Sequence, residues 1–373
     1  MSWIDWADEA TTATRDSGQW RTPRVLDGDG VTHLLADGRS VVSFASNDYL
    51  GLTQHPAVKA AAHQALDRWG AGSGSARLIV GARPSHSELE AELAKWKHSE
   101  SAVLFPTGFA ANLGVMTVLG GDDVLVCSDE LNHASIIDGC RLSKSDLAIY
   151  PHSDLAELER LLATRGSRRA MVVTDTVFSM DGDVADVDAV ANLCAQHDAL
   201  LVLDEAHAVL GPEPSVAALE QCAHVRVGTL SKTLGSLGGF AASSRILADL
   251  LVNRARSYIF TTASTPADTA AASAALRVLQ SNEGATLLAR LRSNVDRVRL
   301  AHPSPIIPII CGESETAMRK CDALLELGIL VPAIRPPTVR VGSSRLRVTL
   351  SAAHNDDHID LLLKSMESVG LFP

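Results

Sequence analysis

Short apolar runs rich in β-branched residues alternate with amphipathic segments through the middle of this 373-residue chain. Apolar runs of this kind are typical of strands buried on both faces, and segments such as 109–119, 154–164 and 186–197 have helical spacing. The alternation predicts an α/β fold in which a mainly parallel sheet is covered by helices. The expected strands span residues 102–105, 123–127, 170–174, 199–204 and 225–230.

The pattern changes after about residue 281, and a chain of this length exceeds the usual size of one compact core. A smaller C-terminal α/β domain is expected there, built from a long helix, two strands and two further helices. The expected division is an N-terminal segment 1–42, a large domain 43–281 and a small domain 282–373. The elements of the small domain are a helix at 286–301, a strand at 306–310, a helix near 315–327, a strand at 345–350 and a terminal helix.

The charge distribution excludes several classes of partner. The formal net charge of -11 is spread along the chain without an acidic or basic block, which argues against a nucleic-acid or membrane partner. No apolar run approaches the roughly 18 residues that a membrane span needs, and MSWIDWADEATT does not resemble a signal peptide, so a cytoplasmic location is expected.

The six cysteines form no CxxC pair, which predicts buried thiols with neither a metal nor a disulfide.

Polar residues follow three of the predicted strands. Asp204 ends one strand, Ser231 and Lys232 follow another, and the segment 107–109 follows a third. Ligands of such a sheet bind beyond the carboxyl ends of its strands, so the site is expected there.

Two nucleotide-binding motifs can be tested against the Gly-rich stretches, and both fail. A P-loop that ends at Lys232 would need glycine where Arg226 and Ser231 stand. A dinucleotide fingerprint that begins at Gly72 would need glycine at Arg77.

The alternative is that Lys232 acts as a carbonyl-reactive amine. It lies in TLSKTLGSLGG, among small residues that leave room for a bulky group at the ε-nitrogen, and Asp204 in LLVLDEAHAVLG lies upstream. An aspartate at that strand end is favourable if its partner is a protonated pyridine, which then acts as an electron sink. Taken alone, Asp204 could instead be a helix N-cap, and Lys232 a solvated loop lysine.

Together, the order of DEAH and TLSKTLG resembles that of the fold-type-I pyridoxal-phosphate enzymes. Further motifs resemble the α-oxoamine synthase family, and the resemblance runs from about residue 20 to the C-terminus. Within the family, IRPPTV is most similar to the biotin-pathway enzymes that join L-alanine to a pimeloyl thioester. The motifs are SNDYLGL at 46–52, GSGSARLIVG at 72–81, FPTGFAANLGV at 105–115, LNHASIIDG at 131–139, VFSMDGD at 177–183, IRPPTV at 334–339 and RLRVTLSAAH at 345–354.

The resemblance implies five residues around the ring of pyridoxal 5'-phosphate. Lys232 would carry the cofactor as a Schiff base and later remove the Cα proton of the substrate as general base. Asp204 would partner the ring nitrogen, and His133 would stack on the ring. His207 and Ser179 would hold the phenolic oxygen.

The resemblance also implies how the cofactor phosphate is bound. Backbone N–H groups of Gly108 and Phe109 would meet it at a helix start, with the hydroxyl groups of Thr229 and Ser231 nearby. Thr262 matches a residue that reaches the phosphate from the partner subunit, which implies a homodimer with shared active sites.

Four residues are implied on the substrate side. Arg347 would bind the substrate carboxylate, and Asn47 would lie near the incoming acyl group. Arg21, or Arg24 nearby, would help to bind the acyl substrate. Ala76 would leave space for the methyl group of alanine, where glycine-specific relatives have threonine.

Several alternatives remain open. The acyl carrier can be coenzyme A or acyl carrier protein, and a carrier protein would require a basic patch, for which Arg254 and Arg256 are candidates. Arg340 and Arg345 can be surface residues. GSGSAR and TVRVG depart from the commoner family patterns. Rival functions are those of glycine C-acetyltransferase, 5-aminolevulinate synthase, serine palmitoyltransferase, a decarboxylase or aminotransferase of the same fold, and a cofactor-binding regulator without catalysis.

Overall fold

The computed structural model describes residues 1–371, and a seven-stranded mixed sheet forms its centre, in the order β3-β9-β8-β7-β6-β4-β5. Neighbouring strands from β8 to β5 are parallel, whereas β9 runs antiparallel to β3 and β8. The predicted α/β fold is therefore confirmed, with one antiparallel strand that was not expected. The strands are β3 (Ser101–Phe105), β4 (Val124–Asp129), β5 (Asp146–Tyr150), β6 (Arg169–Asp175), β7 (Ala199–Asp204), β8 (His224–Thr229) and β9 (Gly239–Ser243).

Helices cover both faces of this sheet because successive strand residues point to opposite sides. In β7, Val202 packs in a cluster with α4, α5, α9 and α10, whereas Leu201 and Leu203 pack in a cluster with α6, α7 and α8. The helices and helical turns of residues 52–279 are η1 (Leu52–Gln54), α2 (Pro56–Trp69), η2 (Arg77–Gly81), α3 (Pro84–Trp96), α4 (Gly108–Leu119), α5 (Ala134–Leu142), α6 (Leu155–Ala163), α7 (Val187–Gln196), α8 (Val216–Leu219), α9 (Arg245–Arg254), α10 (Arg256–Ile259) and α11 (Pro266–Leu279).

The C-terminal part has a three-stranded sheet in the order β10-β13-β12. Its first helix begins at Asn282 rather than at the expected residue 286, because the Ser281 side chain accepts hydrogen bonds from the N–H groups of Glu283 and Gly284. The elements are α12 (Asn282–Val298), β10 (Ile306–Gly312), α13 (Ser314–Glu326), β11 (Ile329–Leu330), β12 (Ala333–Ile334), β13 (Ser344–Thr349) and α14 (Asp356–Ser368).

The N-terminal segment joins this C-terminal part. It contains α1 (Trp3–Asp16), β1 (Thr32–Leu34) and β2 (Ser40–Ser43), and β2 pairs in parallel with β11. Helix α1 was not expected from the sequence, and none of its residues is buried. The division at residues 42 and 281 stays a prediction.

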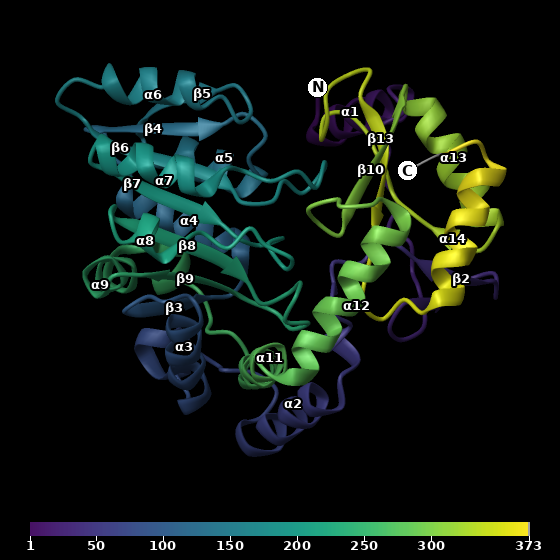
Figure 1. The fold of residues 1–373 in the computed structure, drawn as a ribbon, viewed down its shortest axis with the longest axis horizontal. Helices are drawn as coiled ribbons and strands as arrows, with labels where there is room; N and C mark the ends of the chain where they lie inside the picture. Colours follow the sequence, from purple (N-terminus) through teal and green to yellow (C-terminus); the bar gives the residue numbers. More distant parts are fainter. Residues whose placement is uncertain (372–373) are drawn as a thin grey trace.

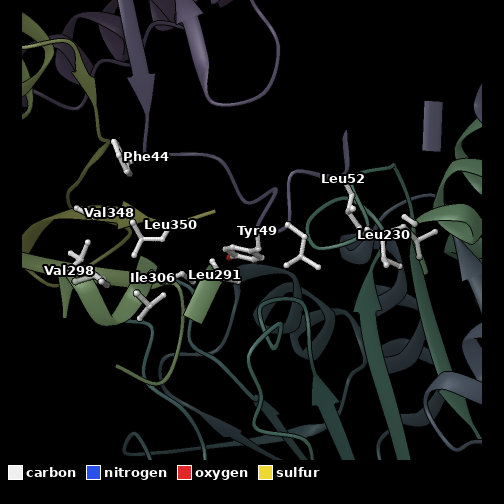
Figure 2. Close-up of a cluster of buried hydrophobic side chains, with 14 of the residues drawn as sticks. Phe44, Tyr49, Leu52, Leu230, Leu291, Val298, Ile306, Val348 and Leu350 are labelled. Carbon is white, nitrogen blue, oxygen red and sulfur yellow. The ribbon is translucent and has the colours of Figure 1, made fainter. Parts of the chain in front are cut away.

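One apolar cluster connects the large sheet to the C-terminal part. Figure 2 shows Tyr49 between Leu52 and Leu230 on one side and Leu291 and Ile306 on the other. Leu230 lies two residues before Lys232, so packing in this cluster helps to fix the lysine loop against the C-terminal part.

The six cysteines have free thiols, and four of them are buried as expected. Cys222 and Cys311 are only partly buried, so the expectation of burial is wrong for these two. Among residues 1–371, the search for a helix both long and apolar enough to cross a membrane finds none.

Candidate active site

Aspartates end three adjacent parallel strands: Asp129 ends β4, Asp175 ends β6 and Asp204 ends β7. Figure 1 shows the carboxyl ends of these strands directed toward α12, β10 and β13. A cavity of about 210 Å³ lies beyond them. Every predicted cofactor contact except Thr262 lines this cavity, namely Gly108, Phe109, His133, Ser179, Asp204, His207, Thr229, Ser231 and Lys232.

One end of the cavity is suited to an anion. Thr107 caps α4 by accepting a hydrogen bond from the N–H of Ala110, and the N–H groups of the first helical residues have no partner within the helix. Gly108 lies so near β8 that a Cβ atom added to it would be 3.4 Å from the Thr229 Cβ. The Oγ1 of Thr229 and the Oγ of Ser231 are 2.7 Å apart. The helix start and two hydroxyl groups therefore converge, as at phosphate sites.

Lys232 and His207 are in direct contact. The lysine Nζ lies 2.8 Å from the His207 Nε2. Burial lowers the pKa of Lys232, while the charges of Asp204 and Asp175 act in the opposite direction. Burial, followed by the charge of Lys232, holds the pKa of His207 well below its usual range. A neutral His207 and a more readily deprotonated amine follow from this arrangement.

A hydrogen-bonded chain connects this pair to two predicted substrate residues. Arg347 Nη2 donates to Asn47 Oδ1 at 3.1 Å, and the Tyr49 hydroxyl donates to the same oxygen at 3.2 Å. The Tyr49 Oη can then accept from His207 Nδ1, 2.5 Å away, which leaves His207 Nε2 as the acceptor for Lys232. Burial raises the pKa of Tyr49 to about 12, so its phenol stays protonated. Tyr49 was not predicted, although it lies in the SNDYLGL motif.

A second chain connects Asp204 to His133. Asn112 Nδ2 donates to Asp204 Oδ2 at 2.7 Å and to Ser135 Oγ at 2.9 Å. The Ser135 hydroxyl can then donate to His133 Nδ1 at 2.8 Å, and the Ser135 N–H also points to this nitrogen. Neutral His133 therefore carries its proton on Nε2. Sequence reasoning missed Asn112 and Ser135, although both lie in motifs that it had singled out.

The loop that carries Ser179 is tied to β13. Arg347 Nε donates to the Ser179 carbonyl, and Arg345 forms an ion pair with Asp181. Arg345 is 7 % exposed, so its interpretation as a surface residue is wrong. Arg340 is exposed and pairs with Glu130.

Six predicted residues do not line this cavity: Asn47 and Arg347 are connected to it through Tyr49 and His207, and the other four, Ala76, Thr262, Arg21 and Arg24, lie elsewhere. Ala76 precedes η2, and the Ser75 carbonyl accepts a hydrogen bond from the Ala263 N–H, which places Ala76 beside Thr262. Arg21 is exposed, and Arg24 lines a separate groove between residues 22–25 and 35–39.

Comparisons with known proteins agree with this geometry. The model for aminotransferase class I and II matches residues 39–366. The chain is 43% identical to the 8-amino-7-oxononanoate synthase of Geobacter sulfurreducens, over 95% of each chain. It is 47% identical to that of Anaeromyxobacter dehalogenans, over 98% of this chain and 96% of the relative. The chain belongs to the 8-amino-7-oxononanoate synthase family.

Solved structures with similar folds support the assignment. A serine palmitoyltransferase with a pyridoxal-phosphate internal aldimine has a TM-score of 0.91 and 27% identity, over 99% of this chain and 98% of that one. An 8-amino-7-oxononanoate synthase from Francisella tularensis has a TM-score of 0.73 and 27% identity, over 88% of this chain and 96% of that one. This synthase-family chain is a pyridoxal-phosphate enzyme, and its cavity fits the cofactor: it offers an anion site, an amine and a carboxylate.

Proposed function

We propose that the enzyme condenses L-alanine with a pimeloyl thioester and releases CO₂, the free thiol carrier and 8-amino-7-oxononanoate, in biotin biosynthesis. The observation that carries the proposal is the 43–47% identity to synthases of that name over nearly the whole chain, combined with a cavity that holds the lysine and aspartate expected for this chemistry. We place the reaction in the cytoplasm, in agreement with six free thiols.

The residues around the cavity have complementary roles in this proposal. Lys232 holds the cofactor through its ε-amine and later moves the proton at the alanine Cα. Asp204 keeps a negative charge at the ring nitrogen, and His133 and His207 orient the ring. Gly108 and its neighbours at the anion end bind the phosphate. When bound, pyridoxal phosphate supplies the conjugated ring that takes up the electron pair released at Cα.

Two residues next to the cavity bind the substrate. Arg347 is buried, and its guanidinium is connected through Asn47 and Tyr49 to His207, which contacts the reacting amine. It binds the alanine carboxylate through charge-assisted hydrogen bonds, while Asn47 holds the guanidinium and lies near the acyl group. Arg21 is proposed to contact the acyl substrate once the enzyme is assembled.

Turnover assays test this function. We expect the highest kcat/KM with L-alanine and pimeloyl thioester, and at least about a tenfold lower value when glycine replaces alanine, because a fitted methyl group contributes about this much. The assay would compare pimeloyl-coenzyme A with pimeloyl-acyl carrier protein, and both with acetyl-, succinyl- and palmitoyl-coenzyme A. Faster turnover of serine with the palmitoyl thioester, or of glycine with the acetyl or succinyl thioester, would contradict the proposal.

The enzyme is proposed to act as a homodimer with shared active sites. Ala76 and Thr262 lie together outside the cavity that Lys232 lines, and Thr262 is exposed. The neighbouring side chains of Leu78, Ile79 and Val80 are 50%, 74% and 70% exposed, an apolar surface suited to a second copy of the chain. Each protomer would thus supply Ala76 and Thr262 to the site of its partner.

Mixed dimers provide a direct test of this sharing. In the Ala76→Thr homodimer, the kcat/KM ratio of alanine to glycine is expected to fall about tenfold or more. In a mixed dimer of Ala76→Thr and Lys232→Ala protomers, the intact lysine would receive Ala76 from its partner. The residual activity should therefore show the parental ratio. A shifted ratio in the mixed dimer, or an active monomer in sedimentation, would show that each protomer builds its own site.

A further inference from the structure

His152 lies outside the cavity and bridges two carboxylates. Its Nδ1 is 3.0 Å from Asp129 Oδ1, and its Nε2 is 2.6 Å from Asp183 Oδ2. A neutral imidazole has only one N–H group, so donation to both carboxylates requires the doubly protonated ring. The hydrogen bonds with Asp129 and then Asp183 raise the pKa of His152 to about 10. The ring also packs edge-on against Phe178, with 4.4 Å between ring centroids.

On one side, His152 reaches the segment that carries His133. The buried carboxylate of Asp129 accepts hydrogen bonds from the N–H groups of Leu131 and Ser153, both at 2.9 Å. The His133 N–H in turn donates to Asp175 at the end of the neighbouring strand. Asp129 therefore fixes the first turn after β4, and His152 supplies the positive charge that a buried carboxylate requires.

On the other side, His152 reaches the segment that carries Ser179. The Val177–Val184 bridge closes this loop at its base, where the Phe178 N–H donates to the Asp183 carbonyl. The Asp183 Oδ1 is buried and has no hydrogen-bond partner within residues 1–371. The contact with His152 is therefore the main restraint on this carboxylate. The same loop is also held by Arg347, which donates to the Ser179 carbonyl, and by Arg345, which pairs with Asp181.

We propose that His152 is a positioning residue that clamps the His133 segment to the Ser179 segment and so sets the distance across the cofactor site. The inference rests on the proposed roles of His133 and Ser179. The two segments follow β4 and β6, which are neighbours in the sheet, and the Asp129–His152–Asp183 bridge spans them. Because a misplacement of about 1 Å can reduce activity on the order of 100-fold, such a clamp matters for catalysis without touching the substrate.

The test compares His152→Gln, Asp183→Asn and the double variant His152→Gln/Asp183→Asn. A glutamine amide can donate to Asp129, but its oxygen faces the charged Asp183. In the double variant, that oxygen can instead accept from the new asparagine amide, which rebuilds the bridge without charge. We expect His152→Gln to weaken pyridoxal-phosphate binding about tenfold or more and to reduce the circular dichroism of the bound cofactor. The double variant should recover at least half of this loss on a logarithmic scale.

His55→Gln is the matched control, because His55 also pairs with a carboxylate, Glu283, at 3.0 Å but does not line the cavity. It should lower the melting temperature and leave cofactor affinity unchanged. The clamp is rejected if His152→Gln behaves in the same way, or if the double variant binds cofactor no better than His152→Gln. Asp183→Asn, a nearly isosteric change, repeats the test should His152→Gln fail to fold. Binding and dichroism need only pyridoxal phosphate, so their outcome is independent of whether the enzyme uses alanine and a pimeloyl thioester.

Discussion

Lys232→Ala is expected to abolish covalent attachment of pyridoxal phosphate and to lower kcat with alanine about 10³-fold or more, since a general base alone contributes roughly 10²–10⁴. Lys232 is the single lysine among the described residues that line the cavity. Its Nζ lies against the neutral His207, and burial lowers its pKa, so the free amine forms more readily than in an exposed lysine.

Borohydride reduction followed by peptide mapping checks the attachment, and steady-state turnover checks the rate. Lys364→Ala, an exposed change on α14, is the control and should behave as the parent enzyme. A reduced adduct on any residue other than Lys232 would contradict the assignment of the active-site lysine.

Asp204→Asn is expected to preserve the fold and to lower kcat about 100-fold or more, a loss typical of removing one preorganised charge. The two oxygens of Asp204 already accept hydrogen bonds from Asn112 and from the Ala206 N–H, which hold the carboxylate in place. An asparagine would keep the shape but would not keep the cofactor nitrogen protonated.

The informative comparison is Asn112→Ala, which removes one hydrogen bond to Asp204 but leaves the charge. Its effect on kcat should be on the order of tenfold, because the carboxylate is only less well oriented. Far-ultraviolet circular dichroism of both variants checks the fold. Near-parental turnover of Asp204→Asn would refute the role of its charge.

Much of the large sheet could be predicted from sequence because its strands are apolar runs that can be recognised locally. The run ALLVLD is apolar on both faces, and β7 has the predicted bounds, Ala199–Asp204. Strand β9 escaped prediction because GFAAS consists mostly of small residues, and only its position between β3 and β8 makes it a strand. Its structure is imposed by long-range packing, which a local pattern does not contain.

The same limit applies to the candidate site. Motifs identified Lys232, Asp204 and His133, because each carries a chemically distinctive group in a recognisable context. The supporting residues Tyr49 and Asn112 have ordinary side chains, and their importance comes from partners far away in the chain. Contacts of that kind are visible only after the fold brings the strand ends together.

The pairing of β2 with β11 has a consequence for how the chain is made. Val42 pairs with β1 on one edge and lies opposite Ile329 on the other, so the second edge of β2 gains its partner only after residue 329 has been made. The seven strands of the large sheet end at residue 243 and can assemble earlier. If the large sheet forms first, the edge of β2 that faces away from β1 stays open, and a premature stop before residue 329 would leave that edge exposed for pairing with other chains.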